Sequence, residues 1–414
     1  MDLTIFPQKL SGKVDAIPSK SHAHRLFLCA ALADAPTRIE ISTLCDDLLS
    51  TLGCISGFGA EIHHEYRTAE AIIPIASSPK QAIVNCGESG STLRFLLPIA
   101  GALGQETIFL LEGRLPYRPL SPLWEEMERH GCRLSWLNRS QLHSILDGNH
   151  QKLPRSVTAG LHLKGQLKAG HYRIDGGVSS QFISGLLMAL PLLPGESHLE
   201  LMGSLESKPY IDLTLDTLSR FGISWNDNRI SGKQPFISPG TVAVEGDWSN
   251  AAFWLAANYL GNQIELHGLN ENSLQGDREI NRLLPLFLSD TPTISASDIP
   301  DLIPILAVVA TKFHGAVFTD VRRLRMKESN RVDTIVSMIQ SLGGKAVADD
   351  NSITISPSPL LGGMVDTVHD HRIAMAAAIA STICRDSVTL LDADCVSKSY
   401  PHFWKEFTRL GGSI

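Results

Sequence analysis

Hydrophobic residues recur along this chain at the spacing of amphipathic helices. Val332, Ile335, Val336 and Ile339 follow an i, i+3, i+4, i+7 pattern, which predicts a helix that stops at Gly343-Gly344. Alternating residues and the turn 349–351 come next and predict a β-hairpin. The same order of helix, glycine, strand and turn recurs in residues 211–228, and more loosely before residues 59, 131 and 411 and around residue 288. The pattern predicts six amphipathic helices.

A second class of helix alternates with the first and is almost entirely apolar, which is typical of buried helices. Each begins with a polar or charged head, near residues 20, 91, 180, 247, 301 and 371. The spacing of these heads defines a unit of about 70 residues that repeats six times, with one buried helix, one outer helix and several short strands. Serine and aspartate at such heads are ordinary helix caps. If the helices converge, their N-termini would also attract anions.

Composition limits the class of protein. The 414 residues predict two to three domains of about 150 residues each. A net charge of -7 argues against a general nucleic-acid-binding protein. The seven cysteines form no CxxC or Cys/His pattern, so neither a disulfide framework nor a zinc site is expected, and free thiols favour the cytoplasm. We expect no signal peptide and no membrane-spanning segment.

Three segments near the N-terminal half carry candidate anion-binding groups. PSKSHAHR at 18–25 places Lys20 at a helix mouth, with Ser21 and Arg25 on one helical face. CGESGSTLR at 86–94 lacks the lysine of a P-loop, but Gly90 permits a close approach of backbone to an anion. GRLPYRPL at 113–120 holds Arg118 on a proline-rich loop, which suits an oxyanion. Capped helices, a tight turn and surface arginines are the simpler interpretations of these segments.

Further segments supply neutral donors, cations and one carboxylate. DGGVSSQF at 175–182 and SKPY at 207–210 offer hydroxyls, an amide and a phenol. RRLRMKESNR at 322–331 surrounds Glu328 with cations at a helix head, where they oppose the macrodipole, and such a local cost favours a functional site. A solvated basic patch is the simpler interpretation of this segment. HDHR at 369–372 and CVSKSYP at 395–401 add Arg372 and Lys398. No metal site is expected in HDHR, because residues i and i+2 of a helix do not face each other.

Taken in order, these segments resemble the 5-enolpyruvylshikimate-3-phosphate synthase (3-phosphoshikimate 1-carboxyvinyltransferase) family of enolpyruvyl transferases. VSSQF, SKPYID, EGDWSNA, IPD, RMKESNR and DHR match in register over the full chain. The resemblance implies an α/β fold of two similar globular domains, each of three βαβαββ units with buried parallel helices, an inside-out α/β barrel. Crossovers near Val14–Ser19 and Pro239–Gly246 would make domain I discontinuous, with residues 1–17 and 246–414. Domain II would comprise residues 18–245, and the active site would lie in the interdomain cleft.

The resemblance implies an activity and a set of roles. The protein would transfer the enolpyruvyl group of phosphoenolpyruvate to the 5-hydroxyl of shikimate 3-phosphate through a tetrahedral intermediate, in the pathway to chorismate and aromatic amino acids, with no cofactor and no metal. Lys20, Asp301 and Glu328 would be catalytic, with Asp301 as base for the 5-hydroxyl and Glu328 as acid for the methylene carbon. Shikimate 3-phosphate would contact Lys20, Ser21, Arg25, Ser179, Ser180, Gln181, Ser207, Tyr210, Asp301, Arg323 and Lys327. Phosphoenolpyruvate would contact Lys20, Gly90, Arg118, Gln181, Arg331, Arg372 and Lys398.

The chain departs from the family pattern at three positions that bear on substrate affinity. Glu88 and Asn330 stand where Asn and Asp are usual, and Arg323 stands where many members have Asn.

One alternative function is that of the sister transferase that acts on UDP-N-acetylglucosamine, which carries a reactive cysteine in the loop corresponding to 113–119, where this chain has none. The other is a non-catalytic anion-binding module, which would lack Asp301 and Glu328. A cytoplasmic monomer is expected, without nucleic-acid or membrane partners, and glyphosate should compete with phosphoenolpyruvate beside Gly90.

Overall fold

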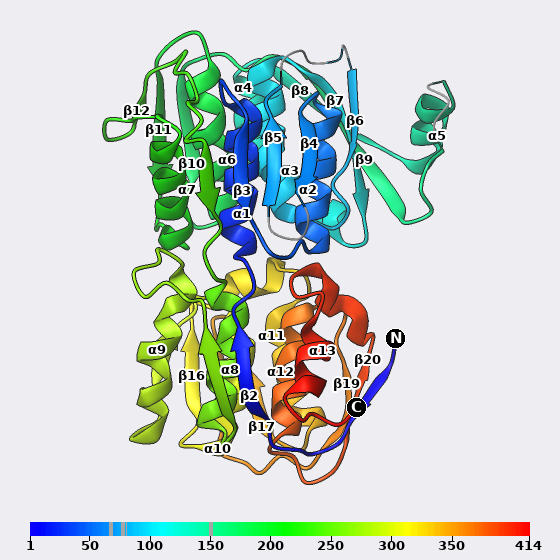
Figure 1. Ribbon diagram of the computed structural model, residues 1–414, viewed down its shortest axis with the longest axis vertical. Coiled ribbons are helices and arrows are strands. Elements are labelled where there is room, and N and C mark those ends of the chain that lie inside the picture. Colours follow the sequence, from blue (N-terminus) through cyan, green and yellow to red (C-terminus); the bar gives the residue numbers. More distant parts are fainter. Residues whose placement is uncertain (66–68, 76–78, 80, 149–151) are drawn as a thin grey trace. The chain divides into compact units, whose positions relative to one another are not determined.

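The computed structural model describes residues 1–65, 69–75, 79, 81–148 and 152–414 (Figure 1). The chain divides into two compact units. Unit 1 contains Met1–Ser19 and Glu245–Ile414, and unit 2 contains Lys20–Val244. Unit 1 is therefore built from both ends of the chain, and Phe6 N donates a hydrogen bond to Ser413 O at 2.9 Å.

Unit 2 alternates helices with short strands. Its elements, in chain order, are α1 (Lys20–Leu32), β3 (Thr37–Glu40), α2 (Asp46–Gly57), β4 (Glu61–Glu65), β5 (Ala69–Ile73), β6 (Gln81–Asn85), α3 (Gly90–Leu103), β7 (Glu106–Glu112), η1 (Leu115–Tyr117), α4 (Leu123–Arg129), β8 (Cys132–Leu137), α5 (Arg139–Gly148), β9 (Val157–Gly165), β10 (His171–Asp175), α6 (Ser180–Ala189), η2 (Leu190–Leu192), β11 (Ser197–Met202), α7 (Lys208–Arg220), β12 (Arg229–Ile230) and β13 (Thr241–Ala243).

Unit 1 follows the same alternation. Its elements are β1 (Leu3–Ile5), β2 (Ser11–Asp15), α8 (Trp248–Tyr259), β14 (Gln263–His267), η3 (Gly276–Glu279), α9 (Ile280–Leu283), η4 (Leu284–Leu288), β15 (Thr293–Ser295), α10 (Ile303–Lys312), β16 (Ala316–Thr319), η5 (Arg322–Met326), α11 (Arg331–Ser341), β17 (Lys345–Ala348), β18 (Ser352–Ser356), β19 (Gly363–Asp366), α12 (His371–Ser381), β20 (Val388–Leu391), η6 (Ala393–Lys398) and α13 (Phe403–Arg409).

The sheets repeat one plan. Three four-stranded sheets have the orders β13-β3-β5-β4, β6-β7-β9-β8 and β15-β16-β18-β17. In each, the first two strands are parallel and the other pairs are antiparallel. The smaller sheets also contain one parallel pair each: β10 with β11, β19 with β20, and β14 with β2. The expected α/β fold of repeated units is confirmed.

Two of the parallel pairs exchange strands between distant parts of the chain. Strand β2 precedes α1 in the sequence but pairs with β14, which follows α8. Conversely, β13 precedes α8 but pairs with β3, which follows α1. Each unit therefore completes its first repeat with a strand supplied by a remote segment, and the chain passes between the units after β2 and after β13.

The predicted buried helices are α1, α3, α6, α8, α10 and α12, and at least three quarters of the residues of each are buried. Four of their heads are capped by the expected side chains: Ser89, Ser179, Asp247 and Asp370 each accept a hydrogen bond from a backbone N–H of the first turn. These helices form two large apolar cores, one in each unit. None of the described helices is long and apolar enough to cross a membrane.

Some local predictions were wrong. Helix α10 begins at Ile303, so Asp301 lies in the preceding turn rather than at the helix head. The amphipathic helix around residue 288 is one α-helical turn followed by a 3-10 segment that contains Pro285, whose ring and missing N–H disfavour a regular α-helix. Residues 223–225 form no strand, and only the single bridge between Asn226 and Arg229 closes that turn. Helix α5 was not predicted.

Candidate active site

Arg331 is the centre of a charged cluster in unit 1. It is the first residue of α11, and its side chain is 1% exposed. Its Nε donates to Asp370 Oδ2 at 2.8 Å, its Nη1 to Asp301 Oδ1 at 2.5 Å and its Nη2 to Glu328 Oε2 at 2.7 Å. These carboxylates offset the cost of a cation at a helix N-terminus, and together they raise the pKa of Arg331 above its usual value although burial alone would lower it.

Asp301 lies between two arginines. Besides Arg331, Arg372 Nη2 donates to Asp301 Oδ2 at 3.4 Å. Burial alone would raise the pKa of Asp301, but the positive charges of Arg372, Arg331 and Lys327 outweigh it and hold the pKa well below its usual range. The carboxylate is therefore ionised at neutral pH, as a proton acceptor must be, although the surrounding positive charge makes it a weak base.

Arg372 is held at the head of α12 by its neighbour Asp370, which caps that helix by accepting from Arg372 N at 3.0 Å. The Arg372 side chain is 3% exposed. Its Nε and Nη1 are buried and meet no hydrogen-bond acceptor among the described residues. Arg331 and Arg372 therefore differ: Arg331 already bonds carboxylates through all three nitrogens, whereas Arg372 retains buried donors for an anion.

Three further cations predicted to bind substrate belong to unit 1. Lys327 directly precedes Glu328, and burial, together with the charges of Arg323 and Arg331, lowers its pKa to about 8 although Asp301 opposes the shift. Arg323 is buried on η5, five residues before Glu328. Lys398 is the last residue of η6, which packs against α12. At neutral pH most Lys327 side chains carry a positive charge. They lose this charge as the pH rises through about 8, which lies within the pH range of an ordinary assay.

Two buried carboxylates of unit 1, Asp370 and Asp277, belong to the site although no sequence motif indicated it. Asp370 was recognised only as a helix head, yet it also bonds Arg331 and accepts from Ser329 Oγ at 2.9 Å. Asp277 on η3 is fully buried and accepts from Ser249 Oγ. Burial and the nearby Asp301 raise the pKa of Asp277 to about 6, although Arg372 opposes this. The position of Asp277 in the sequence does not show that it is buried. That follows only from the packing of η3 against α8, which the sequence does not reveal.

The turn before α12 has an unusual backbone. Val368 and His369 both have positive φ angles, of 50° and 55°, and a β-branched residue rarely adopts this conformation. The turn orients the side chains: His369 is 73% exposed and pairs with Asp392, whereas His371 is buried. In the part of the chain that the structure describes, no three His, Cys, Asp or Glu side chains form a group that could hold a metal ion. Strain at this turn accompanies the placement of Asp370 and Arg372.

In unit 2, Lys20 begins α1 and forms an ion pair with Asp47 of α2, with 2.9 Å between Nζ and Oδ2. Both side chains are largely buried, at 16% and 8% exposed. Asp47 therefore orients the ammonium group predicted to meet both substrate phosphates, and it was not identified from the sequence.

Arg25 is buried one turn further along α1, with neutral acceptors around it. Its guanidinium donates to Thr214 Oγ1 at 2.7 Å, Ser184 Oγ at 3.3 Å, Tyr210 O at 2.9 Å and Ser21 O at 2.5 Å. No described carboxylate forms a salt bridge with it, and burial lowers its pKa to about 10. A buried cation solvated only by neutral groups favours an incoming anion.

Gly90 and Arg118 lie in direct contact. Gly90 is the first residue of α3, and a β-carbon added to it would lie 2.7 Å from Arg118 Nη1. Glycine at this position thus leaves the space that the guanidinium occupies. The Glu88 side chain packs against Gly113, where a β-carbon would collide with it. This contact explains why a glycine with φ 50° occupies the start of the 113–120 loop.

Arg94 joins helix α6, which carries Gln181, to the loop that carries Arg118, and no sequence motif indicated this role. Its Nη1 donates to Gln181 Oε1 at 2.7 Å and its Nη2 to Pro119 O at 2.9 Å. Gln181 in turn donates from Nε2 to Ser91 Oγ at 2.8 Å. Gly185 allows this close approach of α6 to α3, because a β-carbon there would collide with the backbone carbonyl of Arg94. The amide of Gln181 is therefore fixed in one orientation.

The remaining hydroxyl donors are at two helix starts of unit 2. Ser179 caps α6 and Ser180 is its first residue. Ser207 precedes α7 with φ 55°, and Tyr210 lies in the first turn of that helix. Helix α6 packs on both α3 and α7, and α7 packs on α1. The ten predicted site residues of unit 2 thus lie at the starts of α1, α3, α6 and α7 or on the adjoining 115–119 loop, and seven others lie in unit 1.

Comparisons with known proteins support one family over the full chain. The family model for EPSP synthase (3-phosphoshikimate 1-carboxyvinyltransferase) matches residues 6–285 and 290–407. Proteins named 3-phosphoshikimate 1-carboxyvinyltransferase from Clostridium beijerinckii and Clostridium kluyveri are each 37% identical, over 99% and 100% of this chain and 98% of each relative. An EPSP synthase structure from Acinetobacter baumannii covers both chains completely with a TM-score of 0.77 at 20% identity, a likeness that concerns the fold.

The repeated α/β units, the buried arginine–carboxylate cluster and these relatives define a transferase. Within that class, the chain belongs to the EPSP synthase family. The family expected from the sequence motifs is confirmed.

Proposed function

We propose that the protein transfers the enolpyruvyl group of phosphoenolpyruvate to the 5-hydroxyl of shikimate 3-phosphate and releases phosphate. The observation that carries this proposal is Asp301, a partly buried, ionised carboxylate held between Arg331 and Arg372. The reaction needs a base for a hydroxyl beside cations for a carboxylate, and this cluster supplies both.

The carboxylate of phosphoenolpyruvate binds chiefly to Arg372, whose Nε and Nη1 have no acceptor among the described residues. Arg331 contributes charge and a fixed position, but its three nitrogens already bond protein carboxylates. Lys398, on η6 beside α12, is the third cation of this group.

Proton transfer uses two of the three carboxylates that bond Arg331, Asp301 and Glu328. Asp301 accepts the proton of the 5-hydroxyl as the hydroxyl oxygen forms a bond to C2 of phosphoenolpyruvate. Glu328 supplies a proton to C3. Glu328 then takes a proton back from C3 as the bond between C2 and the phosphate oxygen breaks, which restores the enol ether, and the departing phosphate takes the proton held by Asp301. An anion bound to Arg372 reduces the positive charge around Asp301, so substrate binding raises the pKa of this carboxyl and makes it a stronger base.

The groups of unit 2 bind the phosphates and the ring. Lys20, Arg118 beside Gly90, and Gln181 take the phosphate of phosphoenolpyruvate. Ser179, Ser180 and Ser207 take that of shikimate 3-phosphate, with Arg323 and Lys327 of unit 1. Arg25 and Ser21 take its carboxylate, and Tyr210 its ring. The support is the placement of hydroxyls, N–H groups and cations at helix starts.

The proposal requires residues 1–17 with 246–414 and residues 18–245 to act on the same pair of substrates. The two substrates together carry two phosphates and two carboxylates. Neither set of cations alone is sufficient to neutralise all four groups. Ligand binding is expected to draw the two sets together and exclude water, which small-angle scattering with both substrates would detect as a smaller radius of gyration. We further propose that the active form is a cytoplasmic monomer.

The test is phosphate release measured with each substrate alone and with both, without added metal. Release only with both supports the proposal. Activity on UDP-N-acetylglucosamine with none on shikimate 3-phosphate would refute it and support the sister activity. Lys20→Met tests the role of Lys20: it should lower the rate of release at least roughly a hundredfold, since one preorganised charge of this kind contributes about 3 kcal/mol in the transition state.

A further inference from the structure

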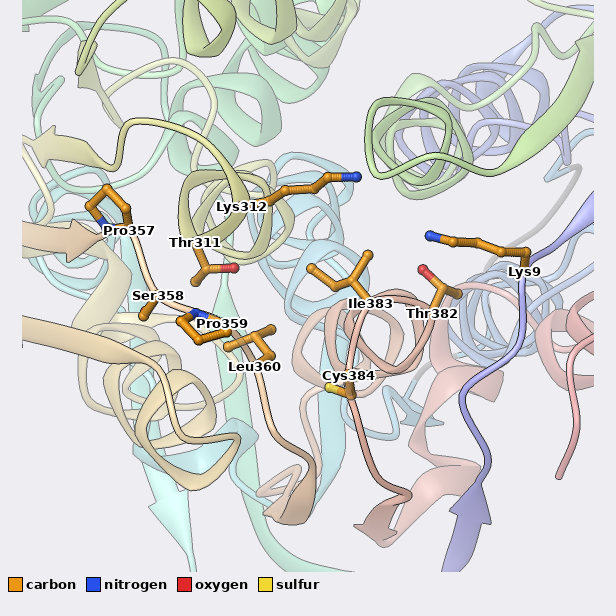
Figure 2. Close-up of a pocket in the computed structure, with 10 residues that line it drawn as sticks. All are labelled: Lys9, Thr311, Lys312, Pro357, Ser358, Pro359, Leu360, Thr382, Ile383 and Cys384. Carbon is orange, nitrogen blue, oxygen red and sulfur yellow. The ribbon is translucent and has the colours of Figure 1, made fainter.

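Unit 1 contains a pocket that the proposed reaction does not use. Its volume is about 710 Å³, within the range typical of small-molecule sites. Figure 2 shows its lining, which comes from residue 9, the end of α10, the loop 357–360 and the end of α12. The walls are partly apolar, with Pro357, Pro359, Leu360 and Ile383, and the residues that line it include no carboxylate.

Two lysines converge at this pocket. Lys9 Nζ and Lys312 Nζ both donate to the backbone carbonyl of Leu260, at 2.8 and 2.9 Å, and their nitrogen ends point toward one another in Figure 2. Two ammonium groups that bond one oxygen are close neighbours, and like charges at such a distance repel. Neither lysine forms a salt bridge with any residue that the structure describes. Burial and the charge of Lys312 lower the pKa of Lys9, as expected for a positive charge in excess.

Helix ends alone do not account for both lysines. Cations are favourable at helix C-termini, and Leu260 is the C-cap residue that follows α8, so one lysine would satisfy its carbonyl. Other carbonyls at these helix ends have their own donors: Thr311 Oγ1 bonds Val308 O, and Thr382 Oγ1 bonds Ile379 O. The second ammonium group therefore remains without an opposite charge.

We propose that this pocket binds an organic anion, whose carboxylate or phosphate group lies between Lys9 and Lys312 and whose apolar body packs on Leu360 and Ile383. The site is separate from the proposed catalytic groups, which lie at the starts of α10 and α12, whereas the pocket lies at their ends. Helices of 10 and 11 residues put about 15 Å between the two sites.

The experiment uses the full chain with phenyl phosphate as the probe, titrated by calorimetry. The pocket variant is Lys9→Met with Lys312→Met, which keeps the alkyl stems. The control is Lys345→Met with Lys405→Met, which removes the same charge from exposed positions of the same unit. Thermal melts of both variants should match wild type. Because the pocket variant keeps the catalytic groups, binding that persists in it reports the other site.

The pocket variant should lose one binding event, or at least tenfold in affinity, while the control binds as wild type does. Inorganic phosphate and phenol should each bind the pocket at least tenfold more weakly than phenyl phosphate, because each lacks one of the two recognised parts. Equal affinity of phenyl phosphate for the wild type, the pocket variant and the control variant would overturn the proposal. So would inorganic phosphate binding as tightly as phenyl phosphate, since the apolar wall would then contribute nothing.

Discussion

Replacing Asp370 by asparagine should separate the support of the charged cluster from its chemistry. Asp370 is fully buried and is not expected to touch substrate. It accepts from Arg331 Nε, from Ser329 Oγ and from the backbone N–H of Arg372. Asparagine keeps the shape and the acceptor that caps α12, but it removes the charge and places an N–H₂ group against one of the donors.

The magnitude follows from the pairing of Arg331. Breaking a buried ion pair by removing one partner costs about 3–5 kcal/mol, and Arg331 keeps Asp301 and Glu328, so the lower end, about 3 kcal/mol, is expected. For a unit of this size each kcal/mol corresponds to about 2–4 °C, so the unit 1 transition should fall by roughly 6–12 °C. The KM for phosphoenolpyruvate should also rise at least tenfold, since Arg331 and Arg372 both lose their anchor.

The assay combines thermal melts with steady-state phosphate release, and Asp290→Asn is the control. Asp290 is exposed in the same unit and loses the same charge on substitution. If Asp370→Asn melts at the temperature of the control and keeps the wild-type KM, then Asp370 does not anchor the arginines and the reasoning fails.

Three other changes have defined outcomes. The KM for shikimate 3-phosphate should rise as the pH increases through about 8, where Lys327 loses its proton, and Lys327→Arg should keep it flat; a wild-type KM constant to pH 9 would contradict this. Because the pKa of Asp277 is raised to about 6 in the folded protein, stability should fall as pH rises from about 4 to 6; Asp277→Asn should melt higher than wild type at pH 7 and show a flatter profile, and an unchanged profile would count against it. Gly90→Ala should displace the Arg118 guanidinium and weaken glyphosate more than phosphoenolpyruvate, because the inhibitor is the longer ligand; equal weakening in inhibition kinetics would show that the site has another shape.

The sequence predicted the repeats because each buried helix carries a local signal, a capped polar head followed by an apolar run. Asp247 and Asp370 cap their helices as expected. Charge pairing could not be predicted in this way. Asp47 is 27 residues from Lys20, and Asp301 is 71 residues from Arg372, so no local pattern connects the partners. Arg94 was passed over for the same reason, since its bonds reach Gln181 and Pro119 on other elements.

The strand exchange was also beyond local patterns, because β2 and β14 are about 250 residues apart and a short strand does not encode a distant partner. The resemblance supplied crossovers near residues 14–19 and 239–246. It did not supply the pairing of β2 with β14 and of β13 with β3.

The origin of unit 1 from both chain ends has a consequence for synthesis on the ribosome. Domains generally fold as units as the chain emerges. Unit 2 is complete once β13 has emerged, because β13 is the last strand that its sheets require. Strand β1, made first, pairs with β20, and Met1 bonds Asp394 near the other end. Residues 1–6, which pair with β20, Asp394 and Ser413, must therefore wait, tethered to an already folded unit 2, until almost the whole chain has been translated, whereas β2 needs only β14. A truncated product that ends after β13 should consequently be a folded unit 2 with a disordered N-terminal arm.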